Sequence, residues 1–497
     1  MENFNAVLTA LDPEKSSLPN PLVSGDSLTE DPSDSAVEVR IKEQVWWKVD
    51  RYILPLTILI YLLSWLDRAN ISNARVVGMQ SDLRLSATEY STALTVTFVP
   101  YIITEIPSNV VLKIIGPNIL LPVLLICWGV VSTLQGVVKN YAGLLACRFF
   151  LGLFEGGLSP GLVLYLSCFY PRHLLQLRIA LLFMCISLAG AFSGLLATVI
   201  SKMDGIGGRS AWSWIFILEG LVTIVFGMLC FWILPNGPET AWFFSKEEKE
   251  YVVLRLKESK ATSDDDGFSW REVWETFRLP HIWILAVNAF LGSSIVLSLA
   301  YFAPSIVLSL GFSPVQTQLM SVPPFATAFI VTVIAAILAD KYRARGITVF
   351  ISSLVSISGY ILYLCSVKKW TLYGSLFLIL AGGSAMAPAW TTWQANNTSP
   401  HIRRATGVAF LIMMTNCSAI LTVWLYGGTL SAPPRYRKAM TVMLIFACLV
   451  EVGVVLNMWW LARENRRKRR VRERGGMKRE DEPKGLGDRS VWFEYIL

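Results

Sequence analysis

Twelve apolar runs, each of about 20 residues, limit what this 497-residue chain can fold into. A run of that length crosses a bilayer as one α-helix. In lipid, only an α-helix or a closed β-barrel satisfies the hydrogen-bonding groups of its own backbone. The chain is 54% hydrophobic and only 16% charged, whereas soluble domains carry about 25% charged residues. We therefore expect an all-α polytopic membrane protein with 12 transmembrane helices.

The runs fall into two sets of six, separated by one long polar segment. This pattern predicts an N-terminal bundle at 50–234 and a C-terminal bundle at 282–462, as in transporters built from repeated halves. Around them we expect a tail at 1–49, a linker at 235–281 and a basic tail at 463–497. Within the linker, alternating charges from Lys246 to Lys260 predict a short surface helix.

Basic residues indicate the orientation. An even number of spans places both termini on one side of the membrane. Basic residues gather just before the first span (Arg40, Lys42, Lys48 and Arg51), seven lie in the linker, and a dense cluster follows the last span. The short loops do not indicate which side is cytoplasmic, since they carry eight basic residues on the proposed cytoplasmic side and ten on the other. We expect both termini in the cytoplasm, in the plasma membrane. The dense run from Arg463 to Arg474 would face anionic lipid rather than nucleic acid.

Enzyme and metal chemistry are not indicated. The eight cysteines are scattered without a CxxC pair, and the three histidines lie far apart in sequence. No nucleophile with a base, metal cluster or phosphate-binding loop is recognisable. We expect a monomer with no cofactor and no metal site.

A few charged residues interrupt the apolar runs, although a charge in the hydrocarbon core costs at least a few kcal/mol. The first run contains "SWLDRANISNA", in which Asp67 and Arg68 are adjacent. Such charges are functional candidates by default. The set within the spans is Asp67, Arg68, Glu105, Arg148, Glu155, Glu219 and Glu451.

The fourth run, "CRFFLGLFEGGLSPG", places Arg148 and Glu155 seven residues apart, hence on one helix face. They form either a polar stripe in a transport path or a structural ion pair in a glycine-rich packing face. Glu105, beside Pro107, has a gating or a structural role. Glu219 follows two tryptophans and is expected at the outer edge or in packing, and Glu451 has no evident partner.

Polar side chains in the second half are further candidates. Gln394 ends the tenth run and Asn416 lies in the eleventh, where they contact a substrate or hydrogen-bond between helices. In the seventh run Tyr301 precedes Pro304, which marks a gate or a proline kink. Trp65 and Tyr301 complete the predicted substrate contacts.

The loop "AILADKYRARG" resembles the gating loop of the major facilitator superfamily, with Asp340, Lys341, Arg343 and Arg345 matching its charges. The corresponding first-half loop, "NVVLKIIGPN", keeps only one basic residue. The segments "WLDRANISNA", "EIPSN", "RFFLGLFEGGLSPG" and "PPRYRKAM" are similar to the anion:cation symporter family, and most similar to fungal permeases for allantoate, nicotinate and related vitamins.

This resemblance implies roles for individual residues. Asp67 and Glu155 match the proton-titrating carboxylates, Arg68 the contact to the substrate anion, and Arg148 the arginine that pairs with the carboxylates. Asn416 matches a polar residue that touches substrate. Two departures matter, because Trp65 stands where members often have Tyr and the seventh run lacks an Arg. A monoanion or weakly charged ligand is therefore expected.

The resulting hypothesis is proton-coupled uptake of a small organic anion, such as a carboxylate, ureide or vitamin, by alternating access. One alternative is an exporter or facilitator of the same fold, although "LAGAFSGLL" lacks the Gly-Pro pair of drug antiporters. Another is a nutrient sensor that does not transport, for which the tails are short.

Overall fold

The computed structural model describes residues 44–261, 270–342, 344–427, 436–475, 482 and 486–496, and within them the regular structure is helical without strands. The N-terminal tail to residue 43 and Arg343 lie outside these ranges. For a few helical residues, Asp340 among them, only the backbone is described. The predicted role of the Asp340 side chain therefore lies outside the described residues.

The first half of the chain forms six long spans, one of them built from two consecutive helices. The helices are α3 (Leu54–Val76), α5 (Ala87–Ile115), α6 (Pro117–Gln135), α7 (Tyr141–Glu155), α8 (Leu158–Ser167), α9 (Arg172–Ile200) and α10 (Ala211–Ile233), with the short α4 (Met79–Asp82) after α3. The fourth span runs from Tyr141 to Ser167, and only Gly156 and Gly157, whose dihedral angles stay in the right-handed helical region, separate α7 from α8.

The second half repeats the arrangement with six helices. They are α13 (Pro280–Ser309), α14 (Pro314–Tyr342), α15 (Arg345–Cys365), α16 (Lys369–Asn396), α17 (His401–Tyr426) and α18 (Arg437–Gly475). Among the described residues, eleven spans are long and apolar enough to cross a membrane, and α5, with 29 residues, is the twelfth long helix. The all-α architecture with twelve spans is confirmed.

Two corrections concern helix ends. Pro304 does not break α13, which continues to Ser309, so the expected interruption after Tyr301 is absent. The basic run from Arg463 is helical rather than a tail, since α18 extends to Gly475. Its 39 residues are about 58 Å long at 1.5 Å per residue, well beyond the thickness of a hydrocarbon core.

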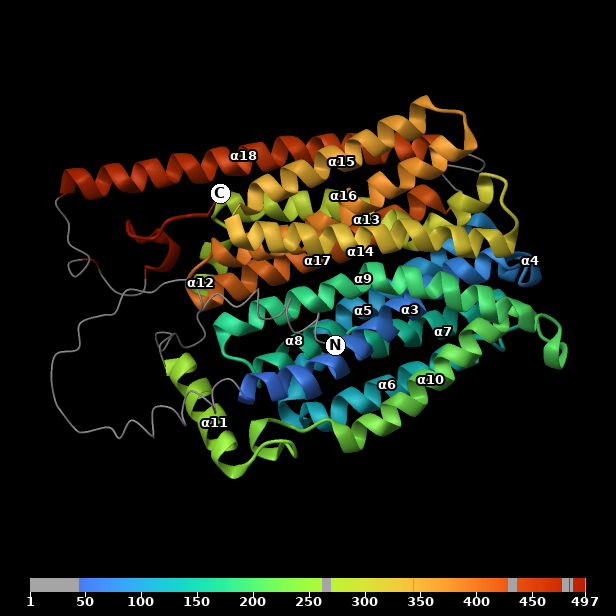
Figure 1. Cartoon of the computed structure of the whole chain (residues 1–497), viewed down its shortest axis with the longest axis horizontal. Helices are drawn as coiled ribbons and strands as arrows, with labels where there is room; N and C mark the ends of the chain where they lie inside the picture. Colours follow the sequence, from blue (N-terminus) through green and yellow to red (C-terminus); the bar gives the residue numbers. More distant parts are fainter. Residues whose placement is uncertain are drawn as a thin grey trace.

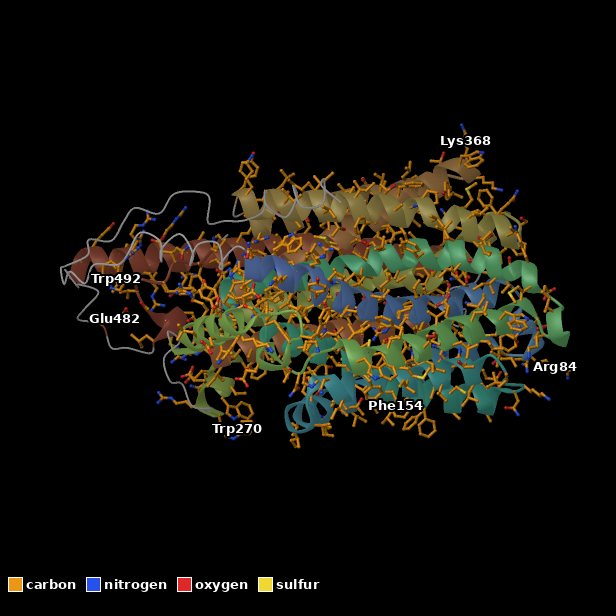
Figure 2. All side chains as sticks on the ribbon, turned by 60° about the horizontal axis from the view of Figure 1, so that its bottom comes forward. Arg84, Phe154, Trp270, Lys368, Glu482 and Trp492 are labelled. Atoms are coloured by element: carbon orange, nitrogen blue, oxygen red, sulfur yellow. The ribbon has the colours of Figure 1, made fainter. Side chains whose placement is uncertain are left out.

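The two sets of long helices lie side by side with their axes roughly aligned (Figure 1). The linker helices α11 (Lys246–Ala261) and α12 (Trp270–Thr276) lie at the end where α18 also terminates, and α4 lies at the other. We call these the tail end and the far end. Trp270, Glu482 and Trp492 mark the tail end, and Arg84 and Lys368 the far end (Figure 2).

Contacts between the halves lie toward the far end. Gln318 Nε2 on α14 donates to the carbonyl of Asn73 at 3.2 Å, and the rings of Phe98 and Tyr301 meet at 6.1 Å. Gly190 on α9 packs so closely that a Cβ there would lie 2.5 Å from the Phe325 ring. This packing holds the far end closed.

Each linker helix is tied to one half at the tail end. The predicted surface helix is α11, and its Glu248 binds Lys48 at 2.7 Å. Helix α12, which was not predicted, binds the second half through Glu272 and Arg403 at 2.5 Å. The same guanidinium reaches buried Asp488 at 2.5 Å, so residues 486–496 fold back onto this end. The C-terminal segment 486–496 is thus packed against the tail end, although the sequence predicted a free tail here.

Candidate functional site

One side of α3 carries a row of polar residues at intervals of three. Ser64, Asp67 and Asn70 share this side because three residues are close to one helical turn. Each is buried and each belongs to a different carboxylate interaction, with successive contacts separated by about 4.5 Å along the helix. We call Ser64, Asp67 and Asn70 the α3 row.

The first member of the α3 row contacts Glu155, at the end of α7. Arg68 Nε lies 2.6 Å from Glu155 Oε1, and the Ser64 hydroxyl donates to the same oxygen. Only 1% of the Glu155 side chain and 12% of the Arg68 side chain are exposed. Glu155 Oε2 makes no hydrogen bond with the described chain. Arg68 and Glu155, two of the charges that the sequence analysis singled out, therefore form a buried ion pair.

The second member, Asp67, points to a different helix. Its two oxygens accept hydrogen bonds from Trp128 Nε1 at 2.9 Å and Ser132 Oγ at 2.6 Å, both on α6. Successive side chains on a helix diverge by about 100°, so Asp67 and Arg68 face different neighbours although they are adjacent in sequence. Neutral donors, rather than an arginine in direct contact, stabilise this carboxylate.

The third member, Asn70, binds Glu219, for which the sequence left an outer-edge or a packing role open. Asn70 Nδ2 donates to Glu219 Oε2 on α10 at 2.6 Å. Both side chains are buried inside the first half, within electrostatic range of Asp67, which fits the packing alternative. The tryptophans before Glu219 suggested a position near the membrane–water interface. The contact with Asn70 could not be read from the sequence, because the two residues are 149 positions apart.

Arg148 is buried without the partner that its spacing suggested. Only 2% of it is exposed, and its Nε and Nη2 atoms have no hydrogen-bond partner in the described chain. Its guanidinium lies 5.8 Å from the centre of the Phe216 ring and within electrostatic range of Asp67. Arg148 and Glu155 do share one helix side, but Glu155 pairs with Arg68 instead.

Arg68 also borders a small cavity between the halves. Its guanidinium carbon lies 4.8 Å from the ring centres of both Trp65 and Tyr101. Tyr301 and Phe325 of the second half close the other side. The cavity has room for about one water molecule. Of the predicted substrate contacts, the structure brings Arg68, Trp65 and Tyr301 together.

The other predicted residues lie apart from this cavity. Asn416 is half-buried on α17, and Gln394 is buried near the tail end, against Gly407. Their contacts do not link them to Arg68, and their role in binding stays a prediction.

The predicted gating residues are likewise dispersed. Glu105 is half-buried on α5, and exposed Lys341 lies 5.7 Å from the Tyr342 ring centre. Arg345 is buried at the start of α15. Their gating role also stays a prediction. In the described part of the chain, no three His, Cys, Asp or Glu side chains come close enough to hold a metal ion.

The sequence matches the family model described as Major Facilitator Superfamily over residues 57–401 and 298–495. The chain belongs to the major facilitator superfamily. A high-affinity nicotinic acid transporter of Saccharomyces cerevisiae is 31% identical over 92% of this chain and 85% of its own length. An uncharacterized transporter of Schizosaccharomyces pombe is 32% identical over 92% of this chain and 91% of its own.

Solved structures show the same major facilitator fold. A D-xylose–proton symporter aligns with a TM-score of 0.62 at 15% identity, covering 82% of this chain and 96% of its own. A bacterial homologue of the lysosomal transporter Spinster aligns with a TM-score of 0.65 at 16% identity and the same coverage. The curated relatives are named transporters, so this chain is a multi-pass membrane transporter and not an enzyme.

Proposed function

We propose that this protein imports a small organic monocarboxylate together with protons. The two bundles, 50–234 and 282–462, would rock about the cavity next to Arg68, with the tail end in the cytoplasm. The observation that carries the proposal is the Arg68–Glu155 pair beside a cavity that both halves line. A guanidinium with a titratable partner can exchange that partner for a substrate carboxylate.

Charge balance gives the mechanism. Protonation of Glu155 removes its charge, and Arg68 would then lose its counter-ion in a buried site. An incoming carboxylate supplies the missing charge and can bind the guanidinium through two parallel hydrogen bonds. Neither charge is left unpaired in a low-dielectric site, a state that costs several kcal/mol. Deprotonation at the cytoplasmic side restores the ion pair and expels the substrate.

The surroundings of Arg68 favour a flat, partly apolar anion. Trp65 and Tyr101 flank the guanidinium, and Tyr301 faces it from the second half. Aromatic side chains stack on rings and attract cations through their faces. Together with the similarity to a nicotinic acid transporter, these contacts support an aromatic carboxylate such as nicotinate as the first ligand to test.

Binding to the purified protein tests the proposal. Nicotinate should raise the unfolding temperature in a concentration-dependent way, and more so at acidic pH, because protonated Glu155 leaves Arg68 available. Nicotinamide, which has the same ring without the charge, is the matched control and should have no effect. Equal stabilisation by both compounds would contradict the role of Arg68, as would undiminished nicotinate binding to the Arg68→Gln/Glu155→Gln double variant.

A further inference from the structure

Two buried oxygen atoms lack a hydrogen-bond donor at the contact between α3 and α10. Asn70 Nδ2 donates to Glu219 Oε2, which leaves Asn70 Oδ1 and Glu219 Oε1 without a partner in the described chain. Both atoms are acceptors if Glu219 is ionised, so they cannot bond to each other. A buried polar atom without a partner is costly, and here two occur in one side-chain pair.

A single proton resolves this arrangement. If Glu219 Oε1 carries it, the O–H group can donate to Asn70 Oδ1 while Asn70 Nδ2 donates to Oε2, as in a cyclic acid–amide pair. The opposite orientation of the amide leads to the same result. It would set two acceptor oxygens 2.6 Å apart, which only a proton between them makes favourable.

The charges around the α3 row also leave room for one proton. Three carboxylates (Asp67, Glu155 and Glu219) accompany two guanidiniums (Arg68 and Arg148). Fully ionised, these five groups have a net charge of −1, which one bound proton neutralises. Half-buried Glu105, within electrostatic range of Arg68, adds a further negative charge. Glu155 has Arg68 in direct contact and Asp67 has two donors, so Glu219 is the carboxylate with the weakest stabilisation of its charge.

Among the described side chains of the neighbouring elements, no Lys or Arg forms an ion pair with Glu219. Helix α10 packs against α3, α6, α9 and the short turn Ser201–Met203. On α3, Asp67 has the same sign as Glu219, Arg68 is paired with Glu155, and Arg75 donates to Gln80 and lies over the Tyr90 ring. Helix α6 has no Asp, Glu, Lys, Arg or His. On α9, Arg178 is bound to Asp50 at 2.7 Å, and Lys202 lies in the far-end turn. The Arg148 guanidinium faces the Phe216 ring of α10 at 5.8 Å.

We propose that Glu219 is a third proton-binding carboxylate, held as a carboxylic acid by Asn70. The step is a proton transfer: a hydronium ion gives one proton to a Glu219 carboxylate oxygen, so that one O–H bond of the hydronium ion breaks, one O–H bond forms on Glu219, and a water molecule is left. Glu219 lies eight residues, or about 12 Å, from the far-end start of α10. In the proposed function, which this step refines, the far end faces outside, so Glu219 would meet an incoming proton before Glu155 does.

Infrared spectroscopy of the full-length protein in lipid nanodiscs tests the proposal without any substrate. The spectrum at neutral pH should contain the carbonyl band of a protonated carboxylic acid. Glu219→Gln should remove that band, while its amide can still pair with Asn70 and preserve the fold. Asn70→Ala should leave the band but shift it to higher frequency, because the carbonyl loses the Nδ2 hydrogen bond. Glu451→Gln, in α18 of the other half, is the matched control and should leave the Asn70-sensitive band in place.

The result that overturns the proposal is a spectrum in which Glu219→Gln removes no band, or one in which Asn70→Ala shifts none. This readout is separate from transport. A Glu219 band that persists in a protein whose uptake ignores the proton gradient would refute only the proposed function. Proton-driven uptake without such a band would refute only the assignment of Glu219.

Discussion

Arg68 and Glu155 form a buried ion pair, Nε to Oε1 at 2.6 Å, between the first and fourth spans of the N-terminal half. The same guanidinium faces Tyr301 of the C-terminal half across the small cavity. Proton binding, substrate binding and the approach of the halves can therefore be coupled at one side chain.

Removing one partner of this pair should destabilise the protein more than removing both. Arg68→Ala leaves Glu155 as a buried unpaired charge, which typically costs about 3–5 kcal/mol of folding free energy. The Arg68→Ala/Glu155→Ala double variant removes both charges and should recover most of that loss. Thermal unfolding of the single and double variants in detergent measures the difference. Additive losses from the two single substitutions would show that the residues do not interact.

Asp67→Asn should make the uptake rate less dependent on pH and should also destabilise the protein moderately. Asparagine has one acceptor oxygen, so either Trp128 or Ser132 loses its acceptor, at a cost of about 1–3 kcal/mol. The matched control is Ser132→Ala, which removes one hydrogen bond but keeps the charge. Initial uptake rates across pH provide the measurement. A variant with Asn at position 67 that keeps the wild-type pH profile would exclude Asp67 from proton coupling.

Gly152 should not tolerate a methyl group. A Cβ there would lie 2.0 Å from the carbonyl oxygen of Thr97 on α5, and backbone cannot move aside as a side chain can. Gly152→Ala should therefore cost about 1–3 kcal/mol through overpacking. Gly374→Ala is the control, because a Cβ at that helical position meets no atom within 4 Å. Unfolding temperatures should fall for the first variant and stay equal or rise for the second.

Acidification should loosen α11 from the first half. Burial raises the pKa of Glu248, but hydrogen bonds from Lys48 and the Ser245 backbone outweigh burial and leave this pKa below its ordinary value of 4.5. A lowered pKa means that the stabilisation is complete above about pH 4.5 and disappears as the pH falls through the folded-state value.

Limited proteolysis within the linker measures this release. Cleavage should accelerate below pH 4.5 in the wild-type protein. Lys48→Met, which removes up to about 1 kcal/mol of ion-pair energy, should show faster cleavage already at neutral pH. Equal cleavage of both proteins across the pH range would mean that this pair does not hold α11.

The sequence predicted the spans well because hydrophobic length is a local property. Each long helix corresponds to an apolar run, and α11 follows from its alternating charges. Helix ends were predicted less well. Helix α13 continues through Pro304 to Ser309, and α18 continues through the polar, Arg-rich segment to Gly475.

The candidate site was predicted in part, for a physical reason. Charges in apolar runs are visible in sequence, so Asp67, Arg68, Arg148 and Glu155 were found. Their pairing depends on how helices face one another, and residues 87 positions apart, such as Arg68 and Glu155, carry no common local pattern. Neutral partners such as Trp128, Ser132 and Asn70 were missed for the same reason, since each is unremarkable in its own segment.

Uptake into proteoliposomes with an imposed pH gradient tests proton-coupled import most directly. The account predicts that labelled nicotinate accumulates above its external concentration when the outside is acidic. A protonophore should abolish this accumulation, and the Glu155→Gln variant should equilibrate the substrate without concentrating it. Accumulation that is unaffected by the gradient and retained in Glu155→Gln would contradict the account.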